Sequence, residues 1–243
     1  MGRLSKARYA ARFADSAADI TAAQRLRHRA FRGGLGEDAD RFDEICRNVL
    51  IEEVKTGTLV ACFRLLALGH GREIGASYSA QFYELSALES YEGRLVEMGR
   101  FCVDTAWKDP DILRVAWAAM TRYVDETGTD LLFGCSSFTG CEAKAYYDAF
   151  AVLRDRHLAP KRWLPKVKAP DVFRFARRLR RVPDPRAAMR TMPPLLKGYL
   201  AMGGWVSDHA VIDRDLGTLH VFTGLEVKSI PAARARLLRG ALA

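Results

Sequence analysis

Glu97 and Arg100 are charged residues inside the otherwise apolar run from Leu95 to Val103, which has the composition of a buried strand. A carboxylate and a guanidinium three residues apart project to opposite faces of a regular strand. Both reach one site only at a strand end, a bulge or a splayed sheet edge. There a carboxylate can act as a general base, while a guanidinium keeps it ionised or neutralises a reacting oxygen. A structural ion pair is the alternative interpretation.

More charged residues lie upstream. Arg27 and Phe31 share one face of a predicted helix, and Arg64 interrupts a predicted apolar strand. Asp40 and Asp43 lie in a polar loop. A surface arginine beside a core aromatic, and a solvated acidic turn, are the simpler interpretations of these pairs. Together the residues indicate a site for a charged, amine-bearing small molecule. The aspartates would bind its cation, and the arginines would bind its carboxylate or order the acidic loop.

The elements that must position these residues follow from hydrophobic periodicity and from cap and turn signals. Their order predicts an α/β or α+β domain with a mixed central sheet and helices on both faces. Residues 1–159 form this predicted core, and residues 160–243 form an extension packed on it. The predicted strands cover residues 8–14, 48–54, 59–68, 94–103 and 130–135, and the predicted helices cover 16–31, 109–128 and 141–150.

The C-terminal third is strongly basic. Residues 160–243 hold 17 Lys or Arg against 6 Asp or Glu, whereas residues 1–159 carry a net charge of −2. Residues 172–181 have apolar side chains at helical spacing and arginines between them, which predicts a basic amphipathic helix. Such a surface suits an acidic carrier protein or an anionic membrane, with a solvated face as the alternative. The candidate partner-binding residues are Lys161, Arg162, Arg174, Arg177, Arg178 and Arg181.

Composition disfavours several kinds of site. The five cysteines are odd in number and irregularly spaced, and the five histidines lack metal-ligand spacing. We therefore expect neither a disulfide framework nor a metal. Cys102 lies near Glu97 but in a buried strand, which makes it a poor nucleophile. No apolar run of 18 residues and no signal-peptide core occur, so we expect a cytoplasmic protein.

The order and spacing of the charged residues also resemble a known family, the acyl-homoserine-lactone autoinducer synthases, which have an acetyltransferase-like (GNAT-type) fold. The matching positions are Arg27-x-x-x-Phe31, Asp40-x-x-Asp43, Arg64, Phe82 and Glu97-x-x-Arg100. The chain resembles their lipid-making relatives, the L-ornithine N-alpha-acyltransferases, still more. That stronger resemblance lies in residues 192–200 (MPPLLKGYL), 203–205 (GGW) and 208–213 (DHAVID).

The resemblance implies an enzyme that moves a 3-hydroxyacyl chain to the alpha-amine of ornithine, or of glutamine in close relatives. It implies no bound cofactor, because the donor is a phosphopantetheine thioester on acyl carrier protein. Acetyltransferases that use free coenzyme A bind its pyrophosphate through a glycine-rich turn. Residues 103–111 have no glycine and three aspartates at the corresponding place, which favours a donor without the nucleotide.

The resemblance also implies further site residues and partners. Ser136, Ser137 and Phe138 would lie near the thioester, and the donor arm would enter between the Glu97 strand and residues 130–135. The enzyme would be peripheral to the inner membrane, with a second O-acyltransferase acting after it and no nucleic acid partner. Two alternatives are an autoinducer synthase that uses S-adenosylmethionine and a basic membrane- or nucleic-acid-binding module without catalysis. Residues 192–213 argue against the first, and the polar residues within strands argue against the second.

Overall fold

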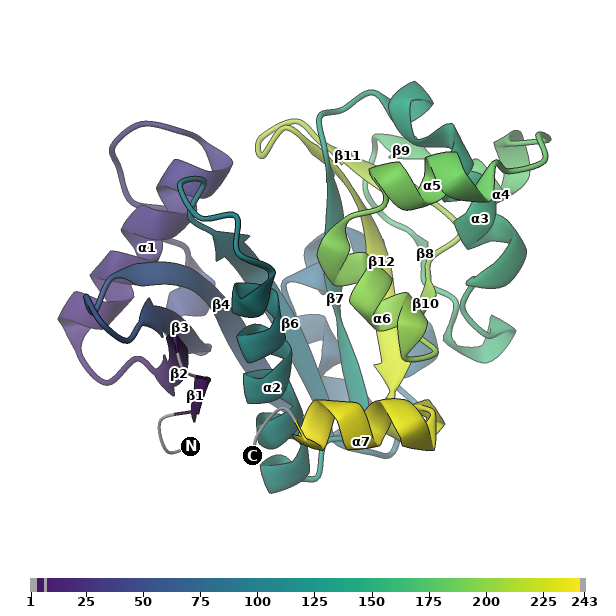
Figure 1. Ribbon diagram of the computed structural model, residues 1–243. Coiled ribbons are helices and arrows are strands. Elements are labelled where there is room, and N and C mark those ends of the chain that lie inside the picture. Colours follow the sequence, from purple (N-terminus) through teal and green to yellow (C-terminus); the bar gives the residue numbers. More distant parts are fainter. Residues whose placement is uncertain (1–3, 7, 241–243) are drawn as a thin grey trace. The chain divides into compact units, whose positions relative to one another are not determined.

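A computed structural model describes residues 4–6 and 8–240 of the chain, which divides into two units (Figure 1). The first unit comprises residues 1–67, 96–129 and 231–243, and the second comprises residues 68–95 and 130–230. The predicted boundary between residues 159 and 160 therefore falls inside the second unit. The reason is strand pairing, because a late strand pairs along its whole length with a strand that precedes residue 159.

The sheet of the first unit confirms the predicted strands of the N-terminal half. Neighbouring strands from β1 to β4 pair antiparallel, and β6 lies next to β4. The turn between β3 and β4 contains Gly57 with φ of 70°, a left-handed conformation that favours glycine. In sheet order the strands are β1 (Leu4–Lys6), β2 (Tyr9–Phe13), β3 (Arg47–Glu53), β4 (Leu59–Leu68) and β6 (Leu95–Val103).

Helix α1 (Ala17–Phe31) covers one face of this sheet. It begins where predicted, because the Ser16 side chain accepts a hydrogen bond of 3.2 Å from the backbone N–H of Asp19. Its apolar face packs Leu26 against side chains of β3 and β4 in a small buried core. Arg27 follows directly on that helix, at the point where the core gives way to polar residues.

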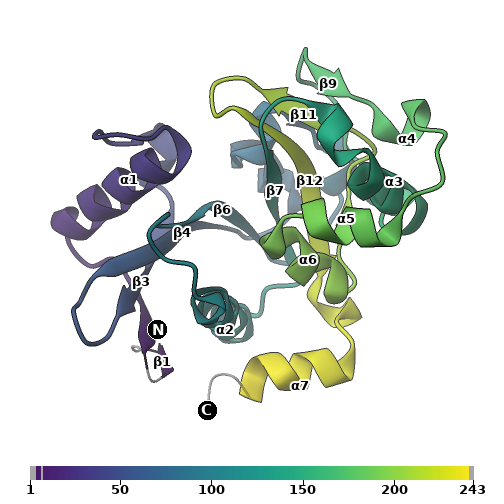
Figure 2. The same cartoon turned by 45° about the horizontal axis from the view of Figure 1, so that its top comes forward.

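Helix α2 (Pro110–Thr127) covers the opposite face, as Figure 2 shows. Asp109 caps its N-terminus, and Gly128 ends it with φ of 63°, both as predicted. Tyr123 of α2 meets Phe13 of β2 edge to face, with ring centroids 6.1 Å apart. Helix α7 (Ala232–Gly240) also contacts α2.

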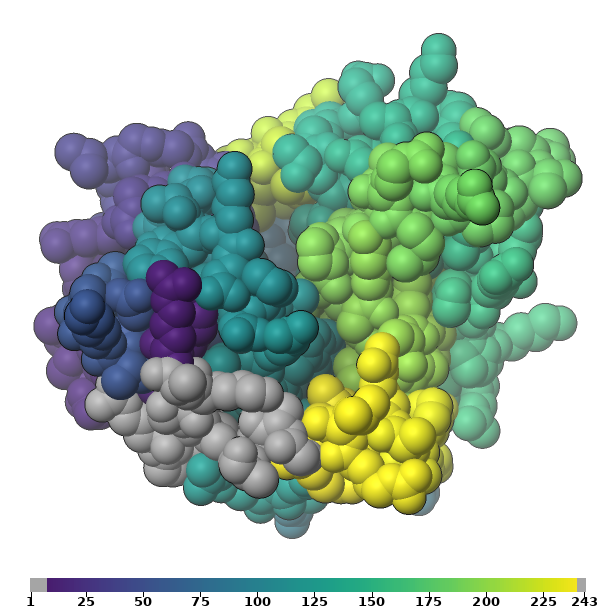
Figure 3. All heavy atoms as spheres, viewed as in Figure 1, coloured from purple at the N-terminus to yellow at the C-terminus, as the bar shows by residue number. Residues whose placement is uncertain are grey.

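The second unit has its own antiparallel sheet, in the order β7 (Leu131–Thr139), β12 (Thr218–Glu226), β11 (Ala210–Asp213) and β9 (Val172–Phe173). Strand β10 (Trp205–Val206) pairs with the far end of β12, and β5 (Tyr83–Glu84) pairs with β8 (Lys166–Val167). A core that includes Phe138, Phe150 and Leu196 lies between one face of the sheet and the helices. Figure 3 shows two of them, α5 and α6, in green on the surface of this unit. The helices are α3 (Tyr147–Arg156), α4 (Phe175–Arg178), α5 (Pro185–Thr191) and α6 (Pro194–Ala201).

The predicted basic amphipathic helix over residues 172–181 is wrong. Val172 and Phe173 instead form β9 and pair with β11, and only four residues after them are helical. Helical spacing of apolar residues was present, but Phe173 is buried in the core of the second unit as a strand residue. Tertiary packing therefore overrides the local pattern here.

Two further boundaries differ from the prediction. Strand β7 runs on to Thr139, so residues 136–138 pair with β12 and do not form a loop after the strand. Helix α3 begins at Tyr147, after a short 3₁₀ turn at Ala143–Tyr146, and not at residue 141.

Candidate functional site

A network of three arginines and three aspartates lies in the first unit. The arginines come from α1, β4 and β6, and the aspartates come from the loop that follows α1. Their formal charges cancel, which is the condition under which charges can be buried. The members of this network are Arg27 of α1, Arg64 of β4, Arg100 of β6, Asp38, Asp40 and Asp43.

Arg27 is the member of the network whose side chain is completely buried. Its two terminal nitrogens each lie 2.8 Å from one carboxylate oxygen of Asp43, which is a bidentate pair. Its Nε lies 3.3 Å from Asp38 Oδ2, and Nη2 also donates to the Asp38 carbonyl oxygen. Arg27 therefore ties the acidic loop to α1 at two points.

Arg64 holds the same loop from β4. Its Nη1 and Nη2 lie 2.6 and 3.0 Å from the two carboxylate oxygens of Asp40, and Nη1 lies 3.0 Å from Asp43 Oδ1. Burial alone would raise the pKa of Asp40 and Asp43. Hydrogen bonds and charge from Arg64 and Arg27 outweigh burial, so the pKa of both carboxyls is lowered. Both aspartates are therefore ionised at neutral pH.

Arg100 has an unusual backbone. Among the described residues it is the one non-glycine residue with positive φ, at 53°. Such a conformation costs about 1–3 kcal/mol and persists where surrounding contacts enforce it. Here Nε lies 3.0 Å from Asp38 Oδ2 and Nη2 lies 3.2 Å from Asp40 Oδ2. The strand is thus irregular after Glu97, as the spacing of the two charges predicts.

Glu97 is buried in β6, with 3% of its surface exposed. The charges of Arg64, Glu97, Asp40 and Asp43 also affect the thiol of Cys46, which directly precedes β3. Burial raises the pKa of Cys46 to about 11, so this thiol stays protonated. Glu97 lies in the same strand as Arg100, which belongs to the network.

Asp38 is the member of the network that sequence reasoning missed. It is 6% exposed and pairs with both Arg27 and Arg100, so it links α1 to β6. Its position in the acidic segment, two residues before Asp40, was the available signal. Phe31 also joins the site, because the Arg100 guanidinium lies 5.9 Å from its ring centroid.

Cys102 is buried beside Cys62, with the two sulfur atoms 3.6 Å apart. The contact with Cys62 and burial together raise the pKa of Cys102 well above its usual value. A thiol in this state is a weak nucleophile, which agrees with the expectation from sequence.

The residues predicted to lie near a thioester have three different environments in the second unit. Ser136 is buried, and its Oγ accepts a hydrogen bond of 2.9 Å from Thr223. Phe138 belongs to the core, with its ring 4.9 Å from that of Phe150. Ser137 is exposed. The alternation of β7 therefore leaves Ser137 as the accessible member of the three.

Phe82 precedes β5 and is half-buried. Its ring meets the His220 ring edge to face, with centroids 5.0 Å apart, and lies 5.3 Å from the Tyr78 ring. His220 is a buried residue that the sequence did not single out.

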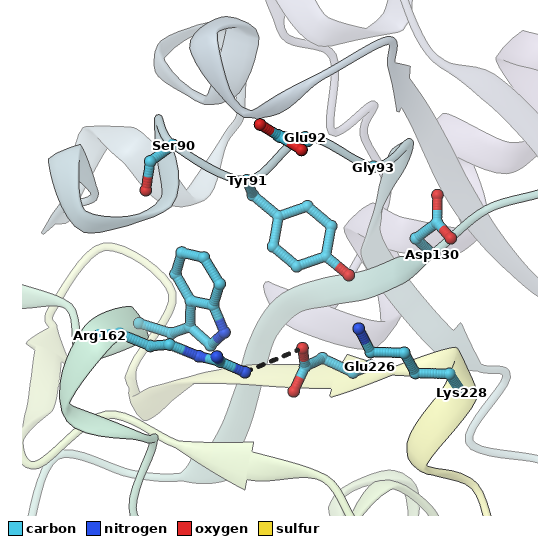
Figure 4. A pocket seen from close by; sticks show the side chains of 9 residues that line it. Ser90, Tyr91, Glu92, Gly93, Asp130, Arg162, Glu226 and Lys228 are labelled. Carbon is cyan, nitrogen blue, oxygen red and sulfur yellow. Dashed lines mark ion pairs between the residues drawn. The ribbon is translucent and has the colours of Figure 1, made fainter.

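The six basic residues predicted to bind a partner are all exposed. Arg181 pairs with Asp148 at 2.9 Å, and Arg162 lies 3.8 Å from Glu226. Arg162 and Glu226 also line a pocket of about 290 Å³ together with Tyr91, as Figure 4 shows. Burial raises the pKa of Tyr91 to about 12.

Residues 4–6 and 8–240 are the part of the chain that the structure describes. In this part of the chain, no group of three or more His, Cys, Asp or Glu residues is placed to hold a metal ion. Within the same residues, none of the helices combines the length and the apolar character that crossing a membrane requires.

Several known proteins are similar to this chain. Residues 25–118 match the acetyltransferase (GNAT) domain family. The chain is 33% identical over 238 residues to the L-ornithine N(alpha)-acyltransferase of Rhodobacter capsulatus, covering 91% of each chain. It is 31% identical over 242 residues to the protein of the same name from Brucella abortus, covering 90% of this chain and 84% of that one. Among solved structures, the AHL synthase LasI aligns with a TM-score of 0.46 and 13% identity over 91% of both chains. The domain match confirms the predicted acetyltransferase-like α/β fold.

Proposed function

We propose that this chain, which belongs to the L-ornithine N(alpha)-acyltransferase family, transfers a 3-hydroxyacyl chain to the alpha-amine of L-ornithine and so forms a lyso-ornithine lipid. The observation that carries the proposal is the 33% identity to a relative of that name across 91% of both chains. The proposed donor is a phosphopantetheine thioester on acyl carrier protein, and the chain's own residues supply the remaining chemistry.

Glu97 is the proposed general base. An ammonium has no lone pair, so the amine must lose a proton before its nitrogen can attack the thioester carbonyl carbon. In the proposed reaction Glu97 takes that proton, and the neutral amine nitrogen forms the new C–N bond. The C–S bond breaks, and the second proton that the nitrogen loses goes to the departing sulfur, which releases the carrier thiol. General-base catalysis of this kind typically contributes about 10²–10⁴-fold. The burial of Glu97 within the described site supports this role.

Arg100 is proposed to keep Glu97 ionised and oriented, or to neutralise charge on the thioester oxygen. Its guanidinium is fixed by Asp38 and Asp40, which supports a role that needs defined geometry. Among the three aspartates of the network, Asp40 has the most exposed side chain, at 24% against 5% for Asp38 and 8% for Asp43. Asp40 is therefore the proposed contact for the substrate cation.

Arg27 and Arg64 are proposed to act mainly by ordering the acidic loop, because the buried guanidinium of each is already engaged with carboxylates. Asp43 belongs to the same support. Phe31 and Phe82 are proposed to contact the substrates, and Ser136, Ser137 and Phe138 to lie along the donor.

Acyl carrier protein is the proposed partner of the basic surface. The support is the exposure of Arg174, Arg177 and Arg178, which form no ion pair within the described part of the chain. An anionic membrane surface is the second proposed partner, and a second O-acyltransferase would use the product.

The function is tested by mass spectrometry of reactions that contain 3-hydroxyacyl carrier protein and one amine. The amines are ornithine, glutamine, lysine and S-adenosylmethionine. We expect N-acyl-ornithine as the main product. N-acyl-glutamine as the main product would mean that glutamine, and not ornithine, is the acceptor. A lactone from S-adenosylmethionine would favour an autoinducer synthase. No product from any amine would overturn the enzyme proposal.

A further inference from the structure

Tyr83 and His220 form a buried polar contact in the second unit that the proposed mechanism does not use. Tyr83 is 1% exposed and His220 is 3% exposed. The Tyr83 hydroxyl lies 2.8 Å from the backbone carbonyl oxygen of His220 and 3.1 Å from Nδ1 of the same residue. One tyrosine therefore holds both the backbone and the ring of His220.

These two contacts determine where the proton of the imidazole lies. A hydroxyl has one hydrogen to donate, and a carbonyl oxygen can only accept. Tyr83 therefore donates to the carbonyl, and the Nδ1–H of His220 donates to the tyrosine oxygen. Nε2 then carries the lone pair of a neutral ring and is a hydrogen-bond acceptor.

The ring is kept neutral by its surroundings. Burial, with a smaller contribution from the nearby His209, lowers the pKa of His220 to about 3. Nε2 is buried and has no hydrogen-bond partner among residues 4–6 and 8–240. A buried acceptor without a donor is unfavourable, so an O–H or N–H group brought by a ligand would be favoured there.

The groups around His220 are aromatic. The Phe82 ring lies 5.0 Å away and the Tyr83 ring 5.6 Å away, and the Tyr83 ring in turn lies 5.7 Å from that of Phe222. His209 is the other buried histidine nearby, with its ring 5.2 Å from that of Tyr83. An acceptor in these mainly aromatic surroundings suits a ligand that is apolar apart from one hydroxyl. It suits a pantetheine arm less well, because the amides of that arm need several polar partners.

His220 also neighbours residues already assigned to the donor. It is the direct cross-strand partner of Ser137 in the β7–β12 pair, so both side chains point to the same face of the sheet. Ser137 is exposed and Phe82 is half-buried. His220 is thus next to an accessible part of the unit and between two proposed contacts of the acyl donor.

We propose that His220 determines the preference for a 3-hydroxylated acyl chain, its Nε2 accepting a hydrogen bond from the 3-hydroxyl group. This inference rests on the proposed function and deepens it. Binding sites built to hydrogen-bond a hydroxyl strongly reject the analogue that lacks it, because the protein acceptor is then left unpaired.

The test compares kcat/KM for ornithine acylation by the full chain with three carrier-bound donors of equal length, which are 3-hydroxyacyl, 3-fluoroacyl and unsubstituted acyl. We expect the wild type to favour the hydroxylated donor by about 10²-fold or more over both others, since fluorine cannot donate a hydrogen bond. His220→Phe should reduce that preference to within about tenfold, and His220→Gln, which keeps an acceptor, should retain more of it.

Two further variants distinguish a change in donor preference from a loss of folded protein. Tyr83→Phe removes the group that keeps the proton on Nδ1, so the preference should fall although His220 is present. His157→Gln changes a half-buried histidine elsewhere in the second unit and should leave the preference unchanged. The ratio between donors is measured within each variant, so a loss of folded protein does not alter it. If His220→Phe does not fold, the inference is still tested by the wild-type preference over the fluorinated donor and by the donor preference of Tyr83→Phe.

The outcomes are distinguishable. If the wild type uses the three donors equally, or if His220→Phe keeps the wild-type ratio, the inference about His220 is overturned and the proposed function stands. If the wild type acylates no amine with any donor, the proposed function itself fails.

Discussion

The two units bury polar groups in opposite ways. In the first unit, each of Arg27, Arg64 and Arg100 lies within 3.3 Å of at least one carboxylate oxygen, and the charges cancel. In the second unit, the contact between Tyr83 and His220 is neutral, and one ring nitrogen of His220 has no hydrogen-bond partner in the part of the chain that the structure describes.

The difference follows from the cost of burial. A buried charge without its counterion costs several kcal/mol, so the charges of such a network must balance before any substrate arrives. A neutral acceptor costs less to leave unpaired, so it can be held ready for a ligand. Under the two proposals, the first unit would act as a support for Glu97, and the second unit would select the acyl chain.

The largest expected effect comes from breaking the charge balance of the first unit. Arg27→Ala removes the bidentate partner of Asp43 and one of the partners of Asp38, which leaves an uncompensated negative charge in the buried network. It should lower the free energy of unfolding by about 3–5 kcal/mol. Arg25→Ala is the matched control on the same helix, because Arg25 forms an exposed pair with Glu37. It should cost no more than about 1 kcal/mol. Urea unfolding measures both, and equal losses would show that the network does not act as a buried unit.

Glu97→Gln tests whether the network supports a base. The substitution keeps the shape of the side chain and removes its ability to take a proton, so kcat/KM should fall by at least about 10²-fold. Glu53→Gln, in β3 of the same sheet, is the control and should keep full activity. Circular dichroism and melting temperature should be close to wild type for both. Full activity of Glu97→Gln would rule out Glu97 as the base.

The two units should lose stability over different ranges of acid pH. The folded pKa of His220 is about 3 and its ordinary value is 6.5, so between these values the unfolded chain binds a proton that the folded chain does not. Its contribution is complete above pH 6.5 and is lost as the pH falls, by up to about 1.4 kcal/mol per pH unit.

Asp40 and Asp43 behave differently, because their folded pKa is lowered from 3.8. Their contribution is complete above that ordinary value and is lost only below it. Urea midpoints at pH 7 and pH 5 measure the first window, and His220→Phe should weaken the decline between them. An unchanged decline would mean that another group titrates there.

The smallest expected effect concerns the exposed arginines. Replacing Arg177, Arg178 and Arg181 with alanine should raise KM for acyl carrier protein by about tenfold at low salt and less at high salt. Replacing Arg114, Arg234 and Arg236 removes the same charge from the first unit and serves as the control. Liposomes that contain anionic lipid measure membrane binding in parallel. If carrier and liposome binding both stay unchanged in the first triple variant, the basic surface is only solvated.

The prediction from sequence was best where local chemistry decides. Ser16, Asp109 and Gly128 act on the backbone within a few residues, so α1 begins where expected and α2 begins and ends where expected. The segment at residues 172–181 shows the opposite case. Its apolar spacing fitted a helix, but Val172 instead pairs with β11 and belongs to the sheet.

Local signals in the amino-acid sequence determined most of the elements, and polar residues within apolar strands identified Arg64, Glu97 and Arg100. Tertiary structure alone decided that Asp38 joins Arg27 to Arg100, that Arg100 takes a left-handed backbone, and that His220 faces Ser137. Each of these depends on residues far apart in the chain, whose approach is set by packing and strand register. Periodicity and spacing act over a few residues and cannot encode such contacts.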